Sequence, residues 1–149
     1  MGTAVRLRVL GTLTVAAALA LSGGPANAAA SSAAPYTCTG GEIPSGTYAS
    51  LTVTGECAVV ADAVINVVGN VNVAAGAVLD AQSAPSTVTI GRNVTGGSGS
   101  IVGLGCQPPA YTGNSAHTCT VEPAKHSTIT IGGNVTVTGG RAVLLNGVT

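Results

Sequence analysis

The residues best suited to chemistry are four cysteines and two histidines. Cys106, His117, Cys119 and His126 form a local cluster with the spacing Cys-x10-His-x-Cys-x6-His. This spacing matches no standard zinc-binding pattern. Oxidation of the two thiols in an exported protein would also remove them as metal ligands. We therefore expect a disulfide-stapled loop at this position, with no metal and no cofactor.

Four cysteines allow three disulfide pairings. The sequence favours Cys38 with Cys57 and Cys106 with Cys119, because each pair closes a short local loop. A bridge over a loop of this size typically contributes about 3 kcal/mol to stability. These four cysteines are the only site residues predicted, and no Ser/His/Asp arrangement for catalysis follows from the spacing.

Two aspartates, Asp62 and Asp80, lie 18 residues apart. In a chain that winds in turns of similar length they could stack as a calcium site or as an acid/base pair. Calcium takes about six to eight oxygen ligands, and paired catalytic carboxylates need a cleft between them. Because Asp is also common in turns, where it accepts hydrogen bonds from its own backbone, we expect a structural role.

The N-terminus has the pattern of a secretory signal peptide. Arg6 and Arg8 precede an apolar run over residues 9–21, which is too short to span a bilayer, and Ala26 and Ala28 supply a cleavage site. The predicted organisation is a signal peptide over residues 1–28, a flexible leader over 29–37 and a β domain over 38–149. The predicted location is secreted and extracellular, and no later segment is expected to span a membrane.

Charge and composition exclude several classes of partner. Only 7% of the residues are charged, and cleavage would remove Arg6 and Arg8 and leave a small acidic excess. Without a cluster of basic residues we expect binding neither to nucleic acid nor to anionic lipid. Phe and Trp are absent, so the core must consist of Val, Ile, Leu and Ala, which suits a narrow interior.

Short runs rich in β-branched residues, separated by glycines, predict an all-β domain. Pairs of threonines two residues apart place hydroxyls on one face of a strand, where they could form an array that binds carbohydrate or ice. Strand propensity alone also favours threonine at such positions. The threonine pairs are 52/54, 87/89, 128/130 and 136/138, and the predicted strands are 51–54, 64–68, 71–73, 87–90, 127–131 and 135–138.

Internal similarity sets the predicted architecture. Asn70, Asn93 and Asn134 occupy matching positions, 23 and 41 residues apart, and short apolar pairs at 78–79, 101–102 and 143–144 follow them. A period near 20 indicates a solenoid of about five short coils, with a loop inserted over residues 106–126. The three asparagines are expected to form a ladder of side-chain amides. Asn93 and Asn134 also match the glycosylation pattern, which is short and often accidental.

These coils, with their Ser-Thr-Val-Thr-Ile-Gly-x-Asn-Val pattern, resemble a short, secreted, right-handed parallel β-helix of the bacterial, pectin-lyase-like type. The resemblance covers residues 46–149 and concerns architecture. Enzymes of this architecture are generally longer and carry clustered acidic and basic residues on one face, and we find no such cluster in the sequence. The expected function is a non-enzymatic structural, surface or matrix protein; the alternatives are a carbohydrate- or ice-binding module and a polysaccharide-acting enzyme.

The C-terminal segment contains no charged strand or helix to cover a last coil. Such a coil would present unpaired backbone groups. We expect either that this coil associates with a second copy or that it belongs to a longer solenoid that has been truncated. If neither holds, the insertion around Pro108 is the candidate cap. Contact with polysaccharide or cell wall is the other expected partnership.

Overall fold

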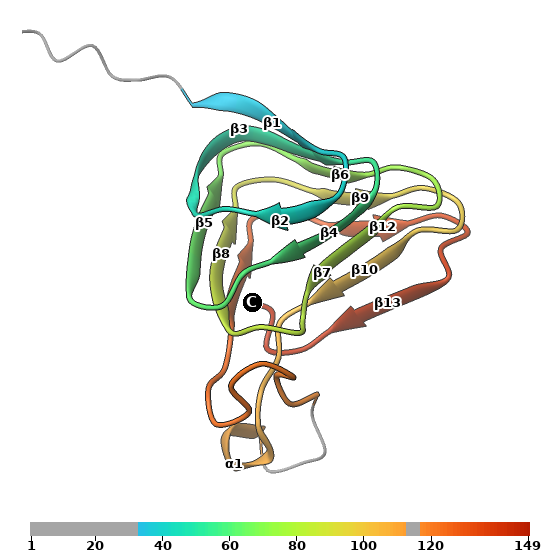
Figure 1. The fold of residues 1–149 in the computed structure, drawn as a ribbon. Helices are drawn as coiled ribbons and strands as arrows, with labels where there is room; N and C mark the ends of the chain where they lie inside the picture. The colour runs from blue at the N-terminus through green and yellow to red at the C-terminus, as the bar shows by residue number, and fades with distance from the viewer. Residues whose placement is uncertain (1–32, 113–116) are drawn as a thin grey trace, which may run out of the picture. The chain divides into compact units, whose positions relative to one another are not determined.

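A computed structural model describes residues 33–112 and 117–149, which lie in a unit spanning Ser31–Thr149. The predicted signal peptide over residues 1–28 lies outside the described residues. The described part is all-β apart from one short helix, and all its strand pairings are parallel (Figure 1). The all-β class predicted from the sequence is confirmed.

The strands form three rows, which we call A, B and C. Rows A and C share the long strand β3, whose second part pairs in row A and whose first part pairs in row C. Row A contains β1 (Ala34–Cys38), the second part of β3 (Gly46–Val53), β6 (Val71–Val73), β9 (Val94–Gly96) and β12 (Val135–Val137). Row B contains β2 (Gly41–Ile43), β4 (Glu56–Val59), β7 (Val78–Ala81), β10 (Ile101–Leu104) and β13 (Ala142–Leu145). Row C contains the first part of β3, β5 (Ala63–Val67), β8 (Ser86–Ile90) and β11 (Thr128–Ile131).

The chain visits row A, then row B, then row C, and returns to row A one strand further along (Figure 1). Each strand therefore hydrogen-bonds to strands that precede or follow it by one such circuit. Because parallel neighbours lie in register, residues at equivalent positions in successive circuits form columns. A residue that points outward in one strand lies next to an outward residue in the following strand.

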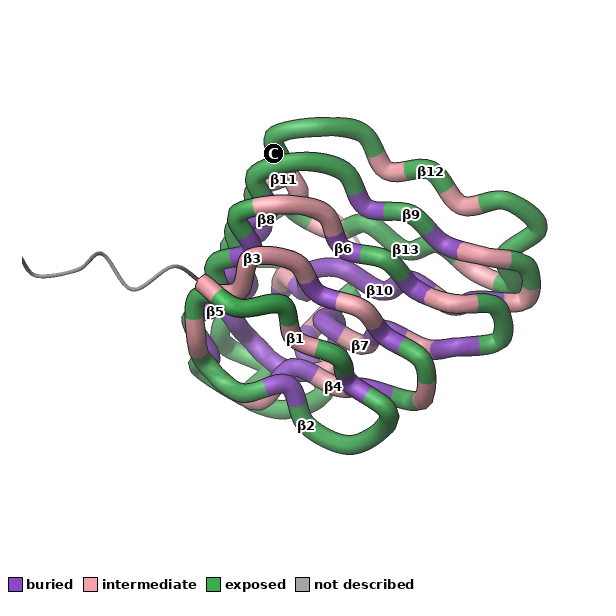
Figure 2. Tube along the Cα trace, turned by 90° about the horizontal axis from the view of Figure 1, so that it is seen from above, coloured by how far each residue is buried: buried purple, intermediate pink, exposed green. Residues whose placement is uncertain are grey.

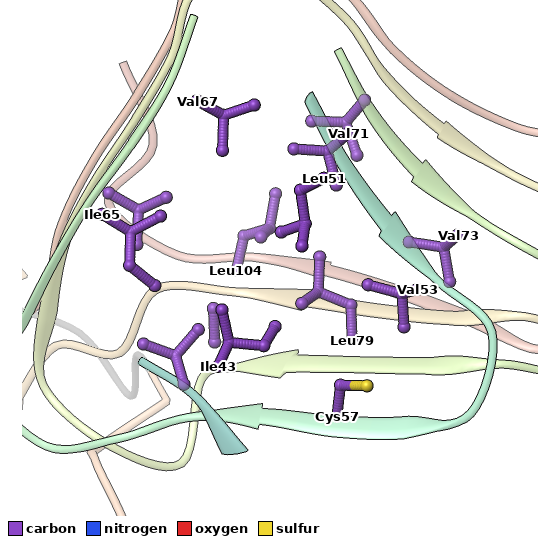
Figure 3. Packing of buried hydrophobic residues seen from close by; sticks show 14 of the residues in the cluster. Ile43, Leu51, Val53, Cys57, Ile65, Val67, Val71, Val73, Leu79 and Leu104 are labelled. Carbon is purple, nitrogen blue, oxygen red and sulfur yellow. The ribbon is translucent and has the colours of Figure 1, made fainter. Parts of the chain in front are cut away.

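The core lies between the three rows and consists of aliphatic side chains, as the composition predicts. Strand β5 shows the pattern clearly, since Ile65 and Val67 are buried while Val64 and Asn66 are exposed. The purple segments in Figure 2 follow this alternation from strand to strand. Figure 3 shows the buried side chains of all three rows converging on one interior, where each large aliphatic side chain contributes about 1.5–3 kcal/mol.

The domain begins earlier than the sequence predicted. The segment 29–37 was expected to be a flexible leader, but β1 starts at Ala34 and pairs with β3. The ring of Tyr36 stacks on that of Tyr48 with centroids 4.9 Å apart. This aromatic contact and the parallel pairing together fix residues 34–37 in the fold.

The predicted strands of rows A and C are present, whereas row B was recognised only as apolar pairs. The register of row B also corrects the last of these pairs. Leu79 pairs with Val102, and Val102 pairs with Val143, so the equivalent third pair is 142–143 and not 143–144. The error arose because β13 contains three large aliphatic residues in succession, so sequence similarity alone does not fix the alignment.

Glycines at the corner between rows C and A permit close backbone contact. An added Cβ at Gly91 would lie 2.3 Å from the carbonyl oxygen of Val68, and one at Gly69 would lie 2.5 Å from that of Ala49. Neither glycine has a positive φ. Glycine is therefore required at these positions because a side chain would not fit. The positive φ that tight corners often need is not the reason here.

The predicted insertion leaves the core between β10 and β11. Cys106 is bonded to Cys119, and a short helix, α1 (Pro109–Thr112), lies within the loop. The backbone N–H of Val121 donates to the carbonyl of Ser83 at 2.8 Å, which anchors the loop to the preceding circuit. No helix in the described part of the chain is long and apolar enough to cross a membrane.

Candidate functional site

Row C carries an ordered surface of uncharged side chains, which we call the Thr face. One outward column runs along Thr47, Asn66, Thr89 and Thr130, and a second runs along Val64, Thr87 and Thr128. All seven side chains are exposed. They are exposed because outward positions of the half-buried strands alternate with the buried aliphatic residues that hold the strands in place.

The spacing within the Thr face follows from strand geometry. Neighbouring strands lie about 4.8 Å apart, and alternate residues of one strand lie about 6.6 Å apart. The hydroxyls therefore form a grid with two different repeats. Threonine also has few accessible χ1 rotamers, so ordering it against a ligand costs little entropy.

Row A carries a single outward column of the same chemistry. Register places Thr52, Asn72, Thr95 and Thr136 in successive strands, with Thr37 before them. The hydroxyl of Thr95 donates to Oδ1 of Asn72 at 2.7 Å. The Thr face has a similar internal contact, since the hydroxyl of Thr130 lies 3.4 Å from that of Thr149. The two surfaces differ in width, because row A offers one outward column and the Thr face offers two.

The asparagine ladder lies at the corner between rows C and A. The backbone N–H of Asn93 donates to Oδ1 of Asn70 at 3.1 Å, and that of Asn134 donates to Oδ1 of Asn93 at 2.9 Å. The predicted ladder is therefore confirmed, with bonds mainly from side-chain oxygen to the backbone of the following circuit. This is a structural role, since the acceptor oxygens are already engaged.

Row B contains a shallow groove of about 530 Å³ that the sequence analysis did not predict. Three acidic residues line it, Glu42, Glu56 and Asp80, and Ala58 and Val78 contribute apolar surface. The acidic residues come from three successive strands. Their separations along the sequence differ from the spacing of the asparagines, so the repeat alone does not bring them together.

The two aspartates singled out in the sequence do not stack on one another. Asp80 pairs in register with Ala58 and Gly103, whereas Asp62 occupies the corner between β4 and β5 with a φ of 59°. Oδ1 of Asp80 accepts hydrogen bonds from the backbone N–H groups of Gln82 and Ser83 at 2.9 and 2.8 Å. Asp80 is thus a strand residue whose carboxylate holds the turn after β7. Its role is structural, as expected, and the alternative of a shared calcium or acid/base site with Asp62 is wrong.

Asp62 takes part in an ion pair that fastens the inserted loop. Nζ of Lys125 lies 2.8 Å from Oδ2 of Asp62 and 3.0 Å from Oε2 of Glu122. Hydrogen bonds to Asp62 and then to Glu122 raise the pKa of Lys125 above its ordinary value. The ammonium group therefore stays charged and is unsuited to act as a nucleophile or general base.

The Cys/His cluster of the loop is held together without a metal ligand set. Both predicted disulfides, Cys38–Cys57 and Cys106–Cys119, are present, so their thiolates cannot bind metal. The ring of His126 lies against that of Tyr111 with centroids 3.9 Å apart. Among the described residues, no group of three or more His, Cys, Asp or Glu side chains is placed to hold a metal ion.

Comparison with known proteins gives no relative from which a function could be transferred. No protein-family model, no curated protein and no solved structure matches the chain.

Proposed function

We propose that this protein is a secreted, non-enzymatic right-handed parallel β-helix that adheres to a neutral polysaccharide surface through the Thr face. The observation that supports this function is the register of Thr47, Asn66, Thr89 and Thr130 in one column, beside a second column containing Thr87 and Thr128. The order of the rows and the parallel register support the β-helix architecture. Two disulfides are compatible with an oxidising, extracellular location.

The chemistry of the Thr face suits a repeating array of sugar hydroxyls. Each threonine hydroxyl both donates and accepts hydrogen bonds, as sugar hydroxyls do. The spacing of about 4.8 Å between strands is comparable to the length that one pyranose unit adds to an extended glycan. The Thr face contains no charged side chain that could compensate a charged sugar for lost hydration, so the ligand expected is neutral. Individually weak contacts on successive strands would then act together.

A sedimentation assay with insoluble polysaccharides tests this function. The wild-type protein, and the variants Thr89→Lys and Thr130→Lys combined, are incubated with cellulose, chitin and purified cell wall, and the bound fraction is measured. We expect binding to at least one of these materials, and at least a tenfold loss in the double variant. The matched control is Thr136→Lys in row A, which should bind as the wild type does.

The assay includes an arm for the alternative ligand. Partition into a slowly growing ice front measures binding to ice, which also presents a regular array of oxygen atoms. Binding to ice in place of polysaccharide would overturn the proposed ligand, although it would retain the Thr face as the site. Binding that is unchanged in the double variant, or absent from all materials, would overturn the role of the Thr face itself.

A second candidate function rests on the row B groove. Glu42 and Glu56 are two carboxylates in one groove, which is the minimum set for hydrolysis of a glycosidic bond. Among the described residues, no basic side chain lines this groove, which therefore lacks the positive charge that would stabilise an acidic polysaccharide during elimination. A hydrolase for neutral glycans is therefore the enzymatic alternative. Release of reducing sugar by the wild type but not by Glu56→Gln would favour it over the adhesive function.

A further inference from the structure

Row B contains a small hollow beside the groove described above. The hollow has a volume of about 200 Å³ and shares Val78 and Asp80 with the groove, so the two adjoin along the row. Most of its lining comes from β7, β10 and the turn after β7. Both strands are interior strands of the row, because β7 pairs with β4 and β10, and β10 pairs with β7 and β13 (Figure 1). The hollow therefore belongs to the middle of the row and not to one of its ends.

Gly103 lines the hollow at an outward position of β10, next to Asp80 in the register. Glycine weakens a strand, and it usually marks a bulge, a close approach of another backbone or the approach of a ligand. The register of β10 with β7 is continuous, so there is no bulge. Gly103 has no positive φ, and an added Cβ would make only ordinary contacts, the nearest at 3.4 Å from the Cβ of Gln82. The approach of a ligand is the reason that remains.

Gln82 brings a polar group without a partner to the same hollow. The residue is only 7% exposed, and its Nε2 has no hydrogen-bond partner among the described residues. Its Oε1 lies 3.5 Å from the position of an added Cβ at Gly103, so the amide borders the space that this glycine leaves. A buried donor without an acceptor is costly and rare in folded proteins. Rotation of the amide would present Nε2 to a ligand in the hollow, and that ligand must supply an acceptor.

The hollow and the groove together carry uncompensated negative charge. Glu42 and Glu56 line the groove, and Asp80 lines both depressions. The ion pairs between described residues all involve Lys125, which lies in the inserted loop, so none of them neutralises these three carboxylates. A concave surface lined by charge of one sign attracts ligands of the opposite sign. The ligand is therefore expected to carry positive charge.

We propose that the hollow and the groove bind a polysaccharide of amino sugars, with one sugar unit seated over Gly103. The hollow is smaller than the pockets of about 300–1,000 Å³ that hold drug-sized ligands, and its size suits one sugar ring. Val78 and Ile101 supply apolar surface for the C–H groups of the ring. A ring hydroxyl accepts a hydrogen bond from Nε2 of Gln82, and the ammonium group of the sugar pairs with Asp80.

An amino sugar meets both requirements of the site, the positive charge and the acceptor. An ammonium group has three donors and no acceptor, so a lysine side chain could pair with Asp80 but would leave Nε2 of Gln82 unpaired. The hydroxyls beside the ammonium group of an amino sugar accept as well as donate. From the hollow the chain continues across the strands, where the carboxylates of Glu42 and Glu56 bind the amino groups of further units. This site lies in row B, and the proposal does not depend on the Thr face of row C.

Calorimetric titration with soluble glucosamine oligosaccharides tests the site, using the secreted, oxidised protein at mildly acidic pH, where the amines are charged. We expect binding, and at least tenfold weaker binding of glucose and N-acetylglucosamine oligosaccharides of the same length, which lack the charge. Gly103→Val should weaken binding at least tenfold, because its side chain fills the hollow. Its thermal stability should equal or exceed that of the wild type, because valine favours strands. If valine destabilises the fold, Gly103→Ala is measured in its place, with an expected loss of at least threefold.

Two further variants separate this site from other surfaces. Glu42→Gln should weaken binding at least threefold, whereas Asp62→Asn, which removes the same charge at a corner outside the two depressions, should not. The combined variant Thr89→Lys and Thr130→Lys should bind the glucosamine oligosaccharide as the wild type does, so the two sites can fail independently. Absence of binding, or unchanged binding by Gly103→Val, would overturn the site. Tighter binding of a lysine oligopeptide than of the glucosamine oligosaccharide would overturn the ligand.

Discussion

The side chain of Asn93 accepts a hydrogen bond from the backbone N–H of Asn134, at 2.9 Å and across 41 residues of sequence. The backbone N–H of Asn93 in turn donates a hydrogen bond to the side-chain oxygen of Asn70. Asn93 therefore connects three successive circuits at one corner. It holds the register between the circuit before the inserted loop and the circuit after it.

Replacing Asn93 by alanine should lower the free energy of unfolding by about 1 kcal/mol, which is the usual net value of such a hydrogen bond. The loss is modest because this corner is exposed and water can reach the freed N–H group. Urea denaturation of the oxidised protein measures it. Asn66→Ala is the control, since Asn66 is an exposed residue of the Thr face, and it should change stability by less than about 0.5 kcal/mol. Equal effects of the two substitutions would contradict the ladder.

Replacing Gly91 by alanine should destabilise the protein by about 1–3 kcal/mol, the usual range for overpacking. The added Cβ would lie 2.3 Å from the Val68 carbonyl oxygen, so one of the two circuits must move. Thermal unfolding followed by circular dichroism measures the change. The neighbouring exposed residue provides a control, Arg92→Ala, for which we expect almost no shift. A Gly91→Ala variant as stable as the wild type would show that the corner has room to adjust.

Sequence patterns predicted most strands of rows A and C because these strands contain alternating β-branched residues, as in Thr87–Ile90 and Thr128–Ile131. Two strands of row A were not predicted, since β1 fell in the expected leader and β9 is only three residues long. Row B was missed because its strands are short and mixed in composition. Strand β4, for example, begins with Glu56 and contains a cysteine and an alanine. The acidic groove was not predicted for the same reason. Glu42 and Glu56 come together through the pairing of β2 with β4, and no local sequence pattern reveals that pairing. The disulfide pairing was predictable because both bridges are local.

Replacing Cys106 and Cys119 together by alanine should lower stability by about 3 kcal/mol, because the bridge restricts the unfolded chain. The loop should also become more sensitive to proteolysis, since only contacts such as Val121 with Ser83 would still hold it. Limited trypsin digestion tests this at Lys125. We expect cleavage there to be faster in the variant and unchanged in Thr136→Lys. Equal digestion rates would show that the ion pair with Asp62 anchors the loop without the disulfide.

The phenol of Tyr48 should ionise late in an alkaline titration. Burial, and then the proximity of Tyr36, raise the pKa of Tyr48 above its ordinary value. Its contribution to stability is therefore fully present below pH 10.0 and is lost as the pH rises through the raised value. Ultraviolet absorbance at alkaline pH reports the phenolates directly. Tyr48→Phe should remove the last step of the titration, whereas Tyr111→Phe should leave that step in place.

The inserted loop shows that a long connection between two strands does not change how those strands pair with their neighbours. The circuit that contains residues 106–126 returns to the same pairing of β11 with β8 as if the loop were absent. The connection between β10 and β11 is about six times as long as the one between β7 and β8. Each doubling of a loop costs only about 0.6 kcal/mol of chain entropy, so the whole extension costs about 1.5 kcal/mol. The corner between β10 and β11 is thus a permissive position, where a foreign peptide could be displayed between Cys106 and Cys119 while the scaffold remains unaltered.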